Sequence, residues 1–359
     1  TAPDLIHYHG SGLDRVYIEQ LSSIDDVPLV VTDNFGWPNR SRLNKLADRW
    51  YFVSDMSRWR YFQLLSVPRT AAKQRKYQRM YNPLSSIDTN SESDQSFIHQ
   101  LGISPETPVI GQISRPGGSM KWSSMSADAL IRAAKMVKNA VIISINPPDN
   151  VKQQFNKSDI SQRVKYITRI DLHHIHTFYD SIDVMAHASR IGESFGYVIA
   201  ESLIRGTPVV VNSTPMRDNA QIELVDNGKN GFVANSIKSF AKAVVQLLRD
   251  DNKRATFGDA AIRKAQRCYS PKQISKSYEQ QYQQVVGENS EQSSNTYRDV
   301  DNFGLEYEKR LTDSFGNESL SYRSERLAWK MVSTHIPAYR YFLYHLLRYR
   351  RLPDQSMIN

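Results

Sequence analysis

The sequence predicts an α/β protein with two domains, each built on a parallel β-sheet. Apolar segments typical of buried strands alternate with segments of helical periodicity, as they do in sheets joined by helical crossovers. Two such alternating series are separated by a polar stretch at 85–94, which is typical of a connection between domains. The chain has 359 residues, enough for two domains of this kind and a further segment.

The first series is short. Its expected elements are strands at 4–9, 27–32 and 49–53 and helices near 12–22, 40–48 and 55–65. These strands are fewer than the roughly five or six that a self-sufficient doubly wound domain has. The first domain is therefore expected to be incomplete, either because it is reduced or because the chain is part of a longer protein.

The second series is longer and begins with a strand at 109–113. Its further elements are strands at 140–145, 164–167, 181–189 and 206–211 and helices near 126–137, 237–250 and 252–267. A polar linker at 287–296 follows, and the remaining residues are mainly of helical pattern. We therefore predict an N-terminal domain at 1–103, a C-terminal domain at 104–286, and a linker with a helical extension at 287–359.

Composition excludes several classes of protein. Hydrophobic residues make up 40% of the chain, but no apolar run is long enough to cross a membrane. Cys268 is the single cysteine, so an intrachain disulfide is excluded and the cytosol is favoured. The chain is expected to be cytoplasmic, at most peripheral to a membrane.

Basic charge is concentrated in one segment. Eleven basic and two acidic residues lie between Arg40 and Arg79, so this segment carries a charge equal to the net +9 of the whole chain. Eight aromatic residues are interleaved with these charges or follow them. One interpretation is a solvated helical face with the aromatic rings in the core. The other is a surface for an anionic partner, either a membrane leaflet or a phosphorylated acceptor. No nucleic-acid motif accompanies the charge.

The segment from Glu193 to Glu201 carries the strongest chemical signal. One carboxylate lies in a loop after a buried strand, and a second lies eight residues later inside the following helix. The start of such a helix offers free backbone N–H groups and the positive end of a dipole, which suits a phosphate or a sugar oxyanion. Carboxylates beside that position can hold sugar hydroxyls. The first hypothesis is therefore a nucleotide-sugar site.

Two cations follow the strand at 109–113. Arg115 and Lys121 flank a glycine-bearing loop at the carboxyl end of this strand. Arginine can bind a phosphate through two hydrogen bonds, and lysine acts as a point charge, so the loop could hold a diphosphate. The alternative is an ordinary basic loop.

Histidines suggest two further sites. His7 and His9 end the first strand, where ligands of an open α/β sheet gather, although either could simply cap the strand end. His173 and His176 could share a helical face and bind a metal, but no distant partner is evident, and we expect no metal. In the C-terminal extension, an apolar stripe at 336–347 is expected to pack on the protein rather than on a membrane.

Several motifs, in the correct order, together resemble one family. The chain is similar to retaining glycosyltransferases of family four, of the E-x7-E type, from about residue 4 to about 285. This resemblance implies the GT-B fold, in which two Rossmann-like domains face each other across a cleft. The motifs that carry it are 4–9, 46–54, Asn82, Arg115 with Lys121, Glu193 to Glu201, 206–208 and 223–231.

The resemblance implies roles around the departing diphosphate and the transferred sugar. Arg115 and Lys121 would neutralise the diphosphate, so no divalent metal is required. Glu193 would contact hydroxyls of the sugar, and His9 would bind the sugar or the reacting centre from across the cleft. Backbone N–H groups at 194–196 (Ser194, Phe195 and Gly196) would hold the sugar or the phosphate.

The resemblance also implies contacts with the nucleotide. Glu201 would bind the ribose hydroxyls, and Arg169 would lie near the base. The glycine-rich first loop of the family's N-terminal domain is absent here, and Ile222 replaces the proline that usually precedes Glu223. A chain lacking that loop is expected to bind a donor yet to transfer its sugar slowly or not at all.

The functional hypothesis is a retaining glycosyltransferase that moves a sugar from a nucleotide-diphosphate donor to a hydroxyl acceptor in glycan, polysaccharide or glycolipid assembly. A first alternative is a non-catalytic module that binds a glycan or a nucleotide sugar within a larger assembly. A second is an epimerase or a phosphorylase of the same fold, which no sequence feature indicates.

Overall fold

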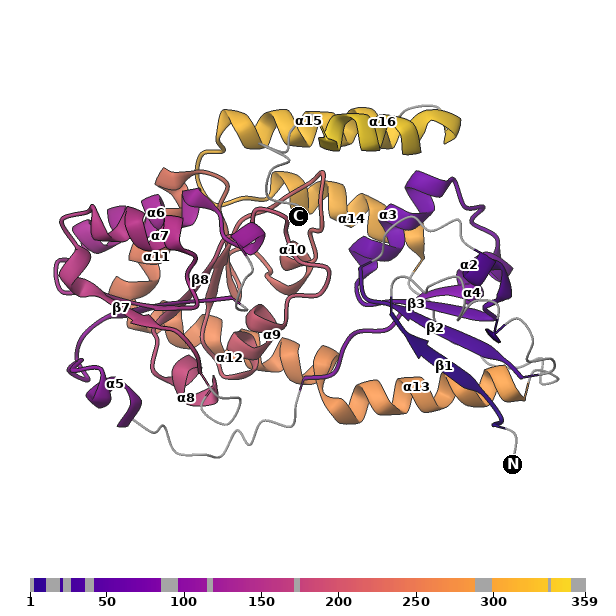
Figure 1. Cartoon of the computed structure of the whole chain (residues 1–359), viewed down its shortest axis with the longest axis horizontal. Coiled ribbons are helices and arrows are strands. Elements are labelled where there is room, and N and C mark those ends of the chain that lie inside the picture. The colour runs from indigo at the N-terminus through magenta and orange to yellow at the C-terminus, as the bar shows by residue number, and fades with distance from the viewer. Residues whose placement is uncertain are drawn as a thin grey trace.

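The computed structural model describes residues 3–10, 20–21, 27–35, 42–84, 96–114, 119–170, 175–287, 299–334 and 337–349. These residues form two parallel sheets, each packed with helices (Figure 1). We call the part around the first sheet, within 3–84, the N-lobe and the part around the second sheet, within 96–270, the C-lobe. The predicted α/β class with two parallel sheets and a helical C-terminal region is confirmed. The predicted domain boundaries themselves stay predictions.

The N-lobe sheet has the order β1-β2-β3-β4, and every neighbouring pair is parallel. Its strands are β1 (Ile6–His9), β2 (Leu29–Asp33), β3 (Arg49–Phe52) and β4 (Tyr77–Arg79). All residues of β2 are buried, because alternate side chains face opposite sides of the sheet and both sides are covered. The polar three-residue strand β4 carries no hydrophobic periodicity, which is why the sequence did not predict it.

Within the part of the chain that the structure describes, the helices with assigned bounds beside this sheet are α2 (Arg42–Leu46), α3 (Asp55–Leu65) and α4 (Ala71–Lys76). Ser54 caps α3 by accepting a hydrogen bond from the backbone N–H of Ser57, and the left-handed Ser66 ends the helix. The bounds of α3 agree with the predicted helix at 55–65. The helix expected at 12–22 lies almost entirely outside the described residues.

The basic, aromatic segment is mostly interior. All eight of its aromatic rings are buried, so the interpretation that places them in the core is confirmed. Arg58 and Arg60 on α3 are 3% and 1% exposed, so these two charges do not belong to a surface patch. Lys45, Lys73 and Arg75 are exposed. Contact of this segment with an anionic partner stays a prediction.

The C-lobe sheet has the order β10-β9-β8-β5-β6-β7, again with parallel pairs. Its strands are β5 (Val109–Ile113), β6 (Val141–Ile145), β7 (Val164–Ile167), β8 (Val184–His187), β9 (Val209–Val211) and β10 (Gly231–Val233). Alternate residues of β9 face opposite sides: Val210 joins one hydrophobic cluster, and Val209 and Val211 join another.

Helices cover both faces of this second sheet (Figure 1). One cluster includes side chains of α6 and α11, and the other includes side chains of α9 and α12. The helices are α5 (Ser96–Gln100), α6 (Ser124–Met136), α7 (Asp149–Asn156), α8 (Ile175–Asp180), α9 (Tyr197–Ile204), α10 (Gln221–Leu224), α11 (Ile237–Arg249) and α12 (Asp251–Tyr269), with 3₁₀ turns at Ser119–Lys121 and Ser161–Arg163.

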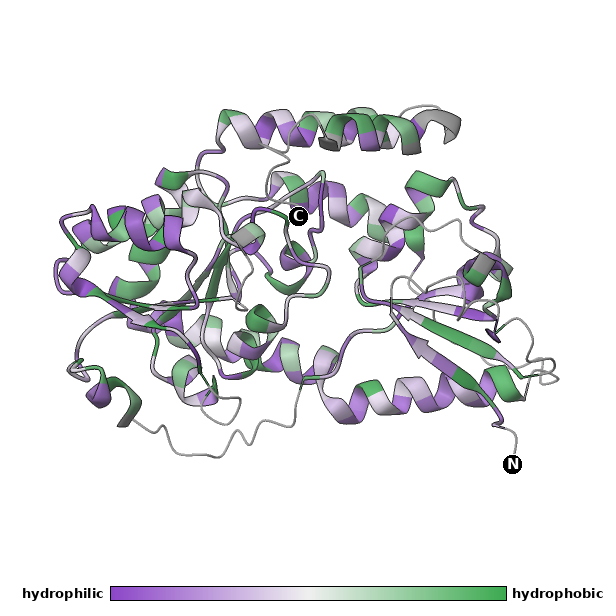
Figure 2. Ribbon diagram, in the orientation of Figure 1, coloured by the Kyte–Doolittle hydropathy of each residue, from purple (hydrophilic) through white to green (hydrophobic). Residues whose placement is uncertain are grey.

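The last helices return to the N-lobe. They are α13 (Pro271–Val286), α14 (Val300–Thr312), α15 (Leu320–Thr334) and α16 (Pro337–Tyr349). Helix α13 runs along the N-lobe sheet (Figure 1), and its residues are largely hydrophilic, in contrast to the hydrophobic first half of β2 (Figure 2). In α16, Leu343 and Leu347 pack against the core, as predicted for the apolar stripe, whereas Phe342 is 66% exposed.

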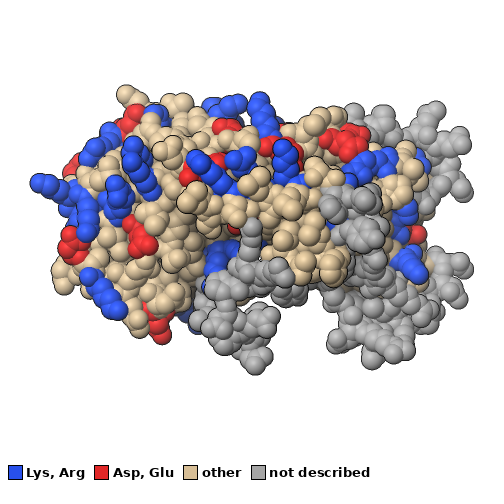
Figure 3. All heavy atoms as spheres, turned by 90° about the horizontal axis from the view of Figure 1, so that it is seen from above, with Lys and Arg blue, Asp and Glu red and all other residues tan. Residues whose placement is uncertain are grey.

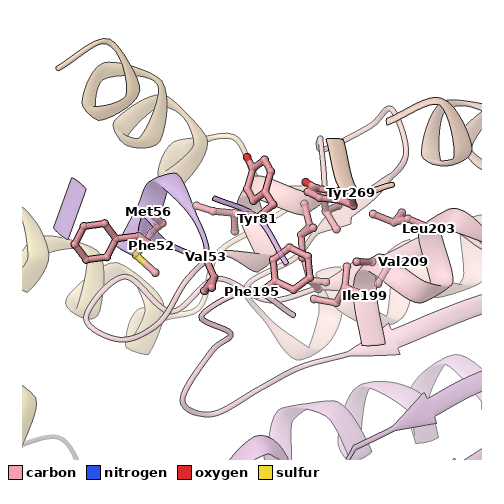
Figure 4. Packing of buried hydrophobic residues seen from close by; sticks show 14 of the residues in the cluster. Phe52, Val53, Met56, Tyr81, Phe195, Ile199, Leu203, Val209 and Tyr269 are labelled. Atoms are coloured by element: carbon pink, nitrogen blue, oxygen red, sulfur yellow. The ribbon is translucent and has the colours of Figure 1, made fainter. Parts of the chain in front are cut away.

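One hydrophobic cluster extends through both lobes. Phe52 and Met56 of the N-lobe belong to the same cluster as Phe195 and Tyr269 of the C-lobe, with Tyr81 between them (Figure 4). Helix α14 joins this cluster, since Trp59 of α3 lies 4.8 Å from Tyr307, measured between ring centroids. The two lobes are therefore held together by shared core. Among the described helices, none combines the length and the apolar composition that crossing a membrane requires.

Candidate functional site

A cavity of about 620 Å³ lies where the two lobes face each other. We call it the interlobe cavity. Asn34, Phe35 and Asn82 line it from the N-lobe side. The C-lobe contributes Ser114, Met120, Lys121, His187, Ile191, Glu193, Ser194, Phe195, Gly196, Tyr197, Val198 and Asp218. The cavity lies beyond the carboxyl ends of β5 and β8, which is where open α/β sheets bind ligands.

The loop before Glu193 is fixed by its backbone. Gly192 has φ +71°, and a Cβ there would lie 1.6 Å from the carbonyl oxygen of Asp218, so only glycine fits. The N–H of Glu193 donates to Oε1 of Gln221 at 2.9 Å, and its carbonyl accepts from the N–H of Ala220 at 2.8 Å. These contacts direct the Glu193 side chain towards Lys121 and His187.

The Glu193 carboxylate has a partner on each oxygen. Nζ of Lys121 lies 2.8 Å from Oε2, and Nε2 of His187 lies 3.0 Å from Oε1. Burial opposes ionisation of Glu193, but the hydrogen bond and charge of His187 together with the charge of Lys121 outweigh it. The pKa of Glu193 therefore lies below its usual value. Lys121 also donates to the carbonyl of Gly192 at 2.7 Å.

Residues 194–196 lead into α9. Gly196 precedes the helix with φ +99°, and Ser194, Phe195 and Gly196 all line the interlobe cavity. The side chain of Phe195 is 3% exposed and packs between Tyr81 and Tyr269 (Figure 4), so it belongs to the core. What this segment can offer a ligand is therefore its backbone and the Ser194 hydroxyl.

Glu201 and Arg169 do not line the interlobe cavity among its described residues. Oε2 of Glu201 accepts a hydrogen bond from the hydroxyl of Tyr179 at 2.8 Å, and burial raises the pKa of Glu201 above its usual value. Arg169 is exposed beyond the end of β7. Both lie on the C-lobe, and their contacts with the nucleotide stay predictions.

The structure does not bring His9 to the interlobe cavity. His9 is exposed at the end of β1, and its ring centroid lies 3.9 Å from that of His7. Nε2 of His7 is hydrogen-bonded to Oγ1 of Thr32 at 2.8 Å. Burial, and then the proximity of His9, lower the pKa of His7 to about 4.

Two of the predicted residues, Arg115 and His173, lie outside the described residues. Within the described ranges, no group of three or more His, Cys, Asp or Glu side chains could hold a metal ion.

Sequence reasoning missed His187 and Asp218 as cavity residues. His187 ends β8 and is 4% exposed, and a histidine within an otherwise apolar buried strand was a usable signal. Asp218 had no comparable signal. It forms an ion pair with Arg60 of the N-lobe at 2.7 Å, a long-range contact that neither sequence neighbourhood indicates.

Family comparison identifies the central part of the C-lobe. Residues 126–264 match the family "Glycosyl transferases group 1". The match includes Glu193 and Glu201 and extends from α6 into α12, whereas Lys121 and the whole N-lobe lie before it.

A curated relative is the D-inositol 3-phosphate glycosyltransferase of Corynebacterium aurimucosum. It is 29% identical over 185 residues, which is 46% of this chain and 41% of the relative. The similar part thus spans less than half of that protein.

Solved structures share the two-lobed fold. Sucrose-phosphate synthase from Thermosynechococcus elongatus has a TM-score of 0.61 at 15% identity, covering 79% of this chain and 74% of its own. Anabaena HepE, solved in complex with UDP-glucose, has a TM-score of 0.60 at 22% identity, covering 77% and 79%. A Rickettsia africae glycosyltransferase has a TM-score of 0.62 at 14% identity, covering 78% and 76%. The fold is therefore of the GT-B type.

Proposed function

We propose that the protein is a retaining glycosyltransferase that uses a nucleotide-diphosphate sugar as donor and a hydroxyl group as acceptor. The observation that carries this proposal is the contact of Lys121 and His187 with the Glu193 carboxylate inside the interlobe cavity, within the lobe that matches the glycosyl transferases group 1 family. A cation beside a buried carboxylate offers one group for a diphosphate and one for sugar hydroxyls.

In the proposed reaction, the acceptor oxygen bonds to C1 of the sugar on the face from which the diphosphate leaves. The bond between C1 and the phosphate oxygen breaks, and the leaving diphosphate takes the acceptor's proton. Negative charge develops on the diphosphate, and Lys121, together with Arg115, would stabilise it electrostatically. These two cations would serve without a metal ion.

Donor binding would rearrange the contacts of Lys121. Its ammonium group now lies 2.8 Å from Glu193, and a diphosphate would compete for that charge. Glu193, still held by His187 on its other oxygen, would then accept hydrogen bonds from sugar hydroxyls. Backbone N–H groups at 194–196 would contact the sugar or the phosphate.

The nucleotide contacts follow the family resemblance. Glu201 would bind the ribose, and Arg169 would lie near the base. His9 would contact the sugar only if a movement of the lobes, or the position of the bound donor, brings the sugar near β1. UDP-glucose is the first donor to test, because a structure of similar fold was solved with it. An acceptor from glycan, polysaccharide or glycolipid assembly, a cytoplasmic location and contact of residues 40–79 with an anionic membrane stay predictions.

Replacement of Lys121 tests this function. We expect Lys121→Met to lower kcat/KM for sugar transfer by about 100-fold, the cost of removing one group that stabilises a developing anion. Lys121→Arg should recover part of the activity. The control is Lys138→Met, which removes an exposed lysine from the same lobe. NMR of the product should show the anomeric configuration of the donor. Unchanged turnover and unchanged nucleotide affinity in Lys121→Met would refute the proposal.

A non-catalytic binding module is the second candidate. The N-lobe sheet has only the four strands β1–β4 among the described residues, and His9 does not line the cavity. A module of this kind would bind the donor without releasing nucleoside diphosphate. Measurement of nucleoside diphosphate release, with and without acceptors, separates the two functions.

A further inference from the structure

A second cavity, of about 570 Å³, is lined in part by Ser189 and Arg190 of the loop that precedes Glu193. We call it the roofed cavity, because Ser319, Ser321, Tyr322 and Glu325 of the C-terminal extension form one part of its wall. The rest of its wall follows the carboxyl ends of β8, β9 and β10. Its lining residues are Ser123, Ser124, Met125, Ser189, Arg190, Asn212, Ser213, Thr214, Arg217, Asn235, Ser236, Ile237, Lys238, Ser319, Ser321, Tyr322 and Glu325.

Two long helices begin at this cavity. Ser123 caps α6 and Ser236 caps α11, each helix has 13 residues, and both caps line the cavity. The start of a helix carries the equivalent of about half a positive charge and backbone N–H groups that its own turns do not use. Two such ends at one cavity favour an anionic ligand.

The charged side chains that line the cavity also favour an anionic ligand. Among the described lining residues, Arg190, Arg217 and Lys238 are cationic, and Glu325 carries the single carboxylate. That carboxylate already accepts a hydrogen bond from the N–H of Met216 at 3.1 Å. The face of the molecule that carries α15 also shows more Lys and Arg than Asp and Glu (Figure 3).

A buried amide provides an independent observation. Asn235 is 3% exposed and lines the cavity. Its Oδ1 accepts a hydrogen bond from the N–H of Ser213 at 2.8 Å, which fixes the orientation of the amide. Its Nδ2 has no hydrogen-bond partner within the described part of the chain. A buried N–H donor without a partner is costly, so a ligand that supplies an acceptor would satisfy it.

We propose that the roofed cavity binds a phosphate-bearing small molecule and is separate from the interlobe cavity. Its wall offers donors: two helix N-termini, three cations and an unused amide. A phosphate group supplies several acceptor oxygens and negative charge to match them. A neutral sugar would also donate hydrogen bonds and so need acceptors, and the carboxylate of Glu325 is already engaged. The extension beyond residue 264, outside the family match, completes the site.

The site also touches the loop that supports Glu193. Oγ of Ser189 donates to the carbonyl of Gly192 at 3.1 Å, and Lys121 donates to the same carbonyl. A ligand that contacts Ser189 would therefore touch a residue that shares the Gly192 carbonyl with Lys121, the partner of Glu193.

Calorimetric titration tests the proposal with two probes, inorganic phosphate and glucose 6-phosphate, which distinguish a free anion from a phosphate ester. All proteins carry Lys121→Met, which removes one of the cations proposed to bind phosphate in the interlobe cavity and so weakens binding there. We expect Lys238→Gln to weaken binding about fivefold, the effect of one exposed charge. Ser321→Trp should fill the cavity and reduce affinity more than tenfold. The control is Lys242→Gln, an exposed lysine one turn further along α11 that does not line the cavity.

The outcomes of this binding experiment do not depend on whether the protein transfers a sugar. Binding that falls in Lys238→Gln and Ser321→Trp but not in Lys242→Gln supports the site, even if no sugar is transferred. Absence of binding of both probes overturns it. So does binding that is insensitive to Ser321→Trp, or that Lys238→Gln and Lys242→Gln weaken equally.

Discussion

Glu193 and Glu201 are eight residues apart and both are largely buried, yet their pKa values shift in opposite directions. Burial acts to raise the pKa of both carboxyl groups. His187 and Lys121 outweigh this effect at Glu193, whereas at Glu201 the hydrogen bond from the hydroxyl of Tyr179 does not. Glu193 therefore stays ionised over a wider pH range. The sequence predicted that both residues matter. It could not predict this difference, because the partners of Glu193 come from β8 and from a 3₁₀ turn far upstream.

The lowered pKa of His7 predicts that the stability of the folded protein depends on pH. Its pKa is about 4 in the folded protein and 6.5 in an unfolded chain, so below pH 6.5 the unfolded chain takes up the proton first. The stabilising contribution of neutral His7 to the free energy of unfolding is complete above pH 6.5 and is lost as the pH falls towards 4. In urea unfolding, the decrease in stability from pH about 7 to about 4.5 should be about 1 kcal/mol smaller in His7→Gln than in the wild type, after allowance for solvent screening. Equal decreases would contradict this assignment.

Among the elements, the loop that ends at Glu193 depends on its glycine, and the chain contains a matched comparison. Gly192 and Gly228 have φ +71° and +74°, but a Cβ at Gly228 would meet nothing within 4 Å, whereas at Gly192 it would collide with the backbone of Asp218. Positive φ alone thus does not distinguish them. The difference arises from close approach of two loops.

Gly228→Ala should lower the free energy of unfolding by about 1 kcal/mol, the cost of a left-handed non-glycine residue. Gly192→Ala adds a steric collision and should cost more than about 3 kcal/mol, with displacement of Glu193 and loss of transfer activity. Thermal and urea unfolding of both variants measure these two losses of free energy. Equal destabilisation would show that the loops do not approach each other as described.

The elements also show where sequence analysis is reliable. Helices with strong hydrophobic periodicity, such as α11, appear within a residue or two of their predicted bounds. Short elements with little periodicity, such as β4 and α10, were not predicted. The loop and helix around Glu193 and Glu201 were predicted because their motif is local. His187 and Asp218 were not, since their roles follow from tertiary contacts.

On the scale of the whole molecule, α3 joins the lobes. The Glu223 carboxylate of the C-lobe accepts hydrogen bonds from the N–H groups of Asp55 and Met56 at the start of α3, at 3.2 and 3.1 Å, and from the hydroxyl of Tyr81. Further along α3, Arg60 pairs with Asp218 and donates to the carbonyl of Phe35 at 2.9 Å. Both Asp218 and Phe35 line the interlobe cavity. The geometry of the cavity therefore depends on this buried junction.

Loss of one partner in the buried Arg60–Asp218 pair should be strongly destabilising. We expect Arg60→Met to cost about 3–5 kcal/mol, because it leaves a buried carboxylate without its cation. The double variant Arg60→Met with Asp218→Asn should recover part of this loss. The control is Arg263→Met on α12, a surface arginine outside the junction. Additive losses in a urea-unfolding double-mutant cycle would mean that the two residues do not interact.

The central claim is that the interlobe cavity binds an activated sugar between Lys121 and Glu193, and a crystal structure with UDP-glucose tests it most directly. The account predicts the diphosphate within hydrogen-bond distance of Lys121 and sugar hydroxyls against Glu193, with Lys121 displaced from that carboxylate. Density for the nucleotide sugar at any other place, with the Lys121–Glu193 pair intact, would contradict it.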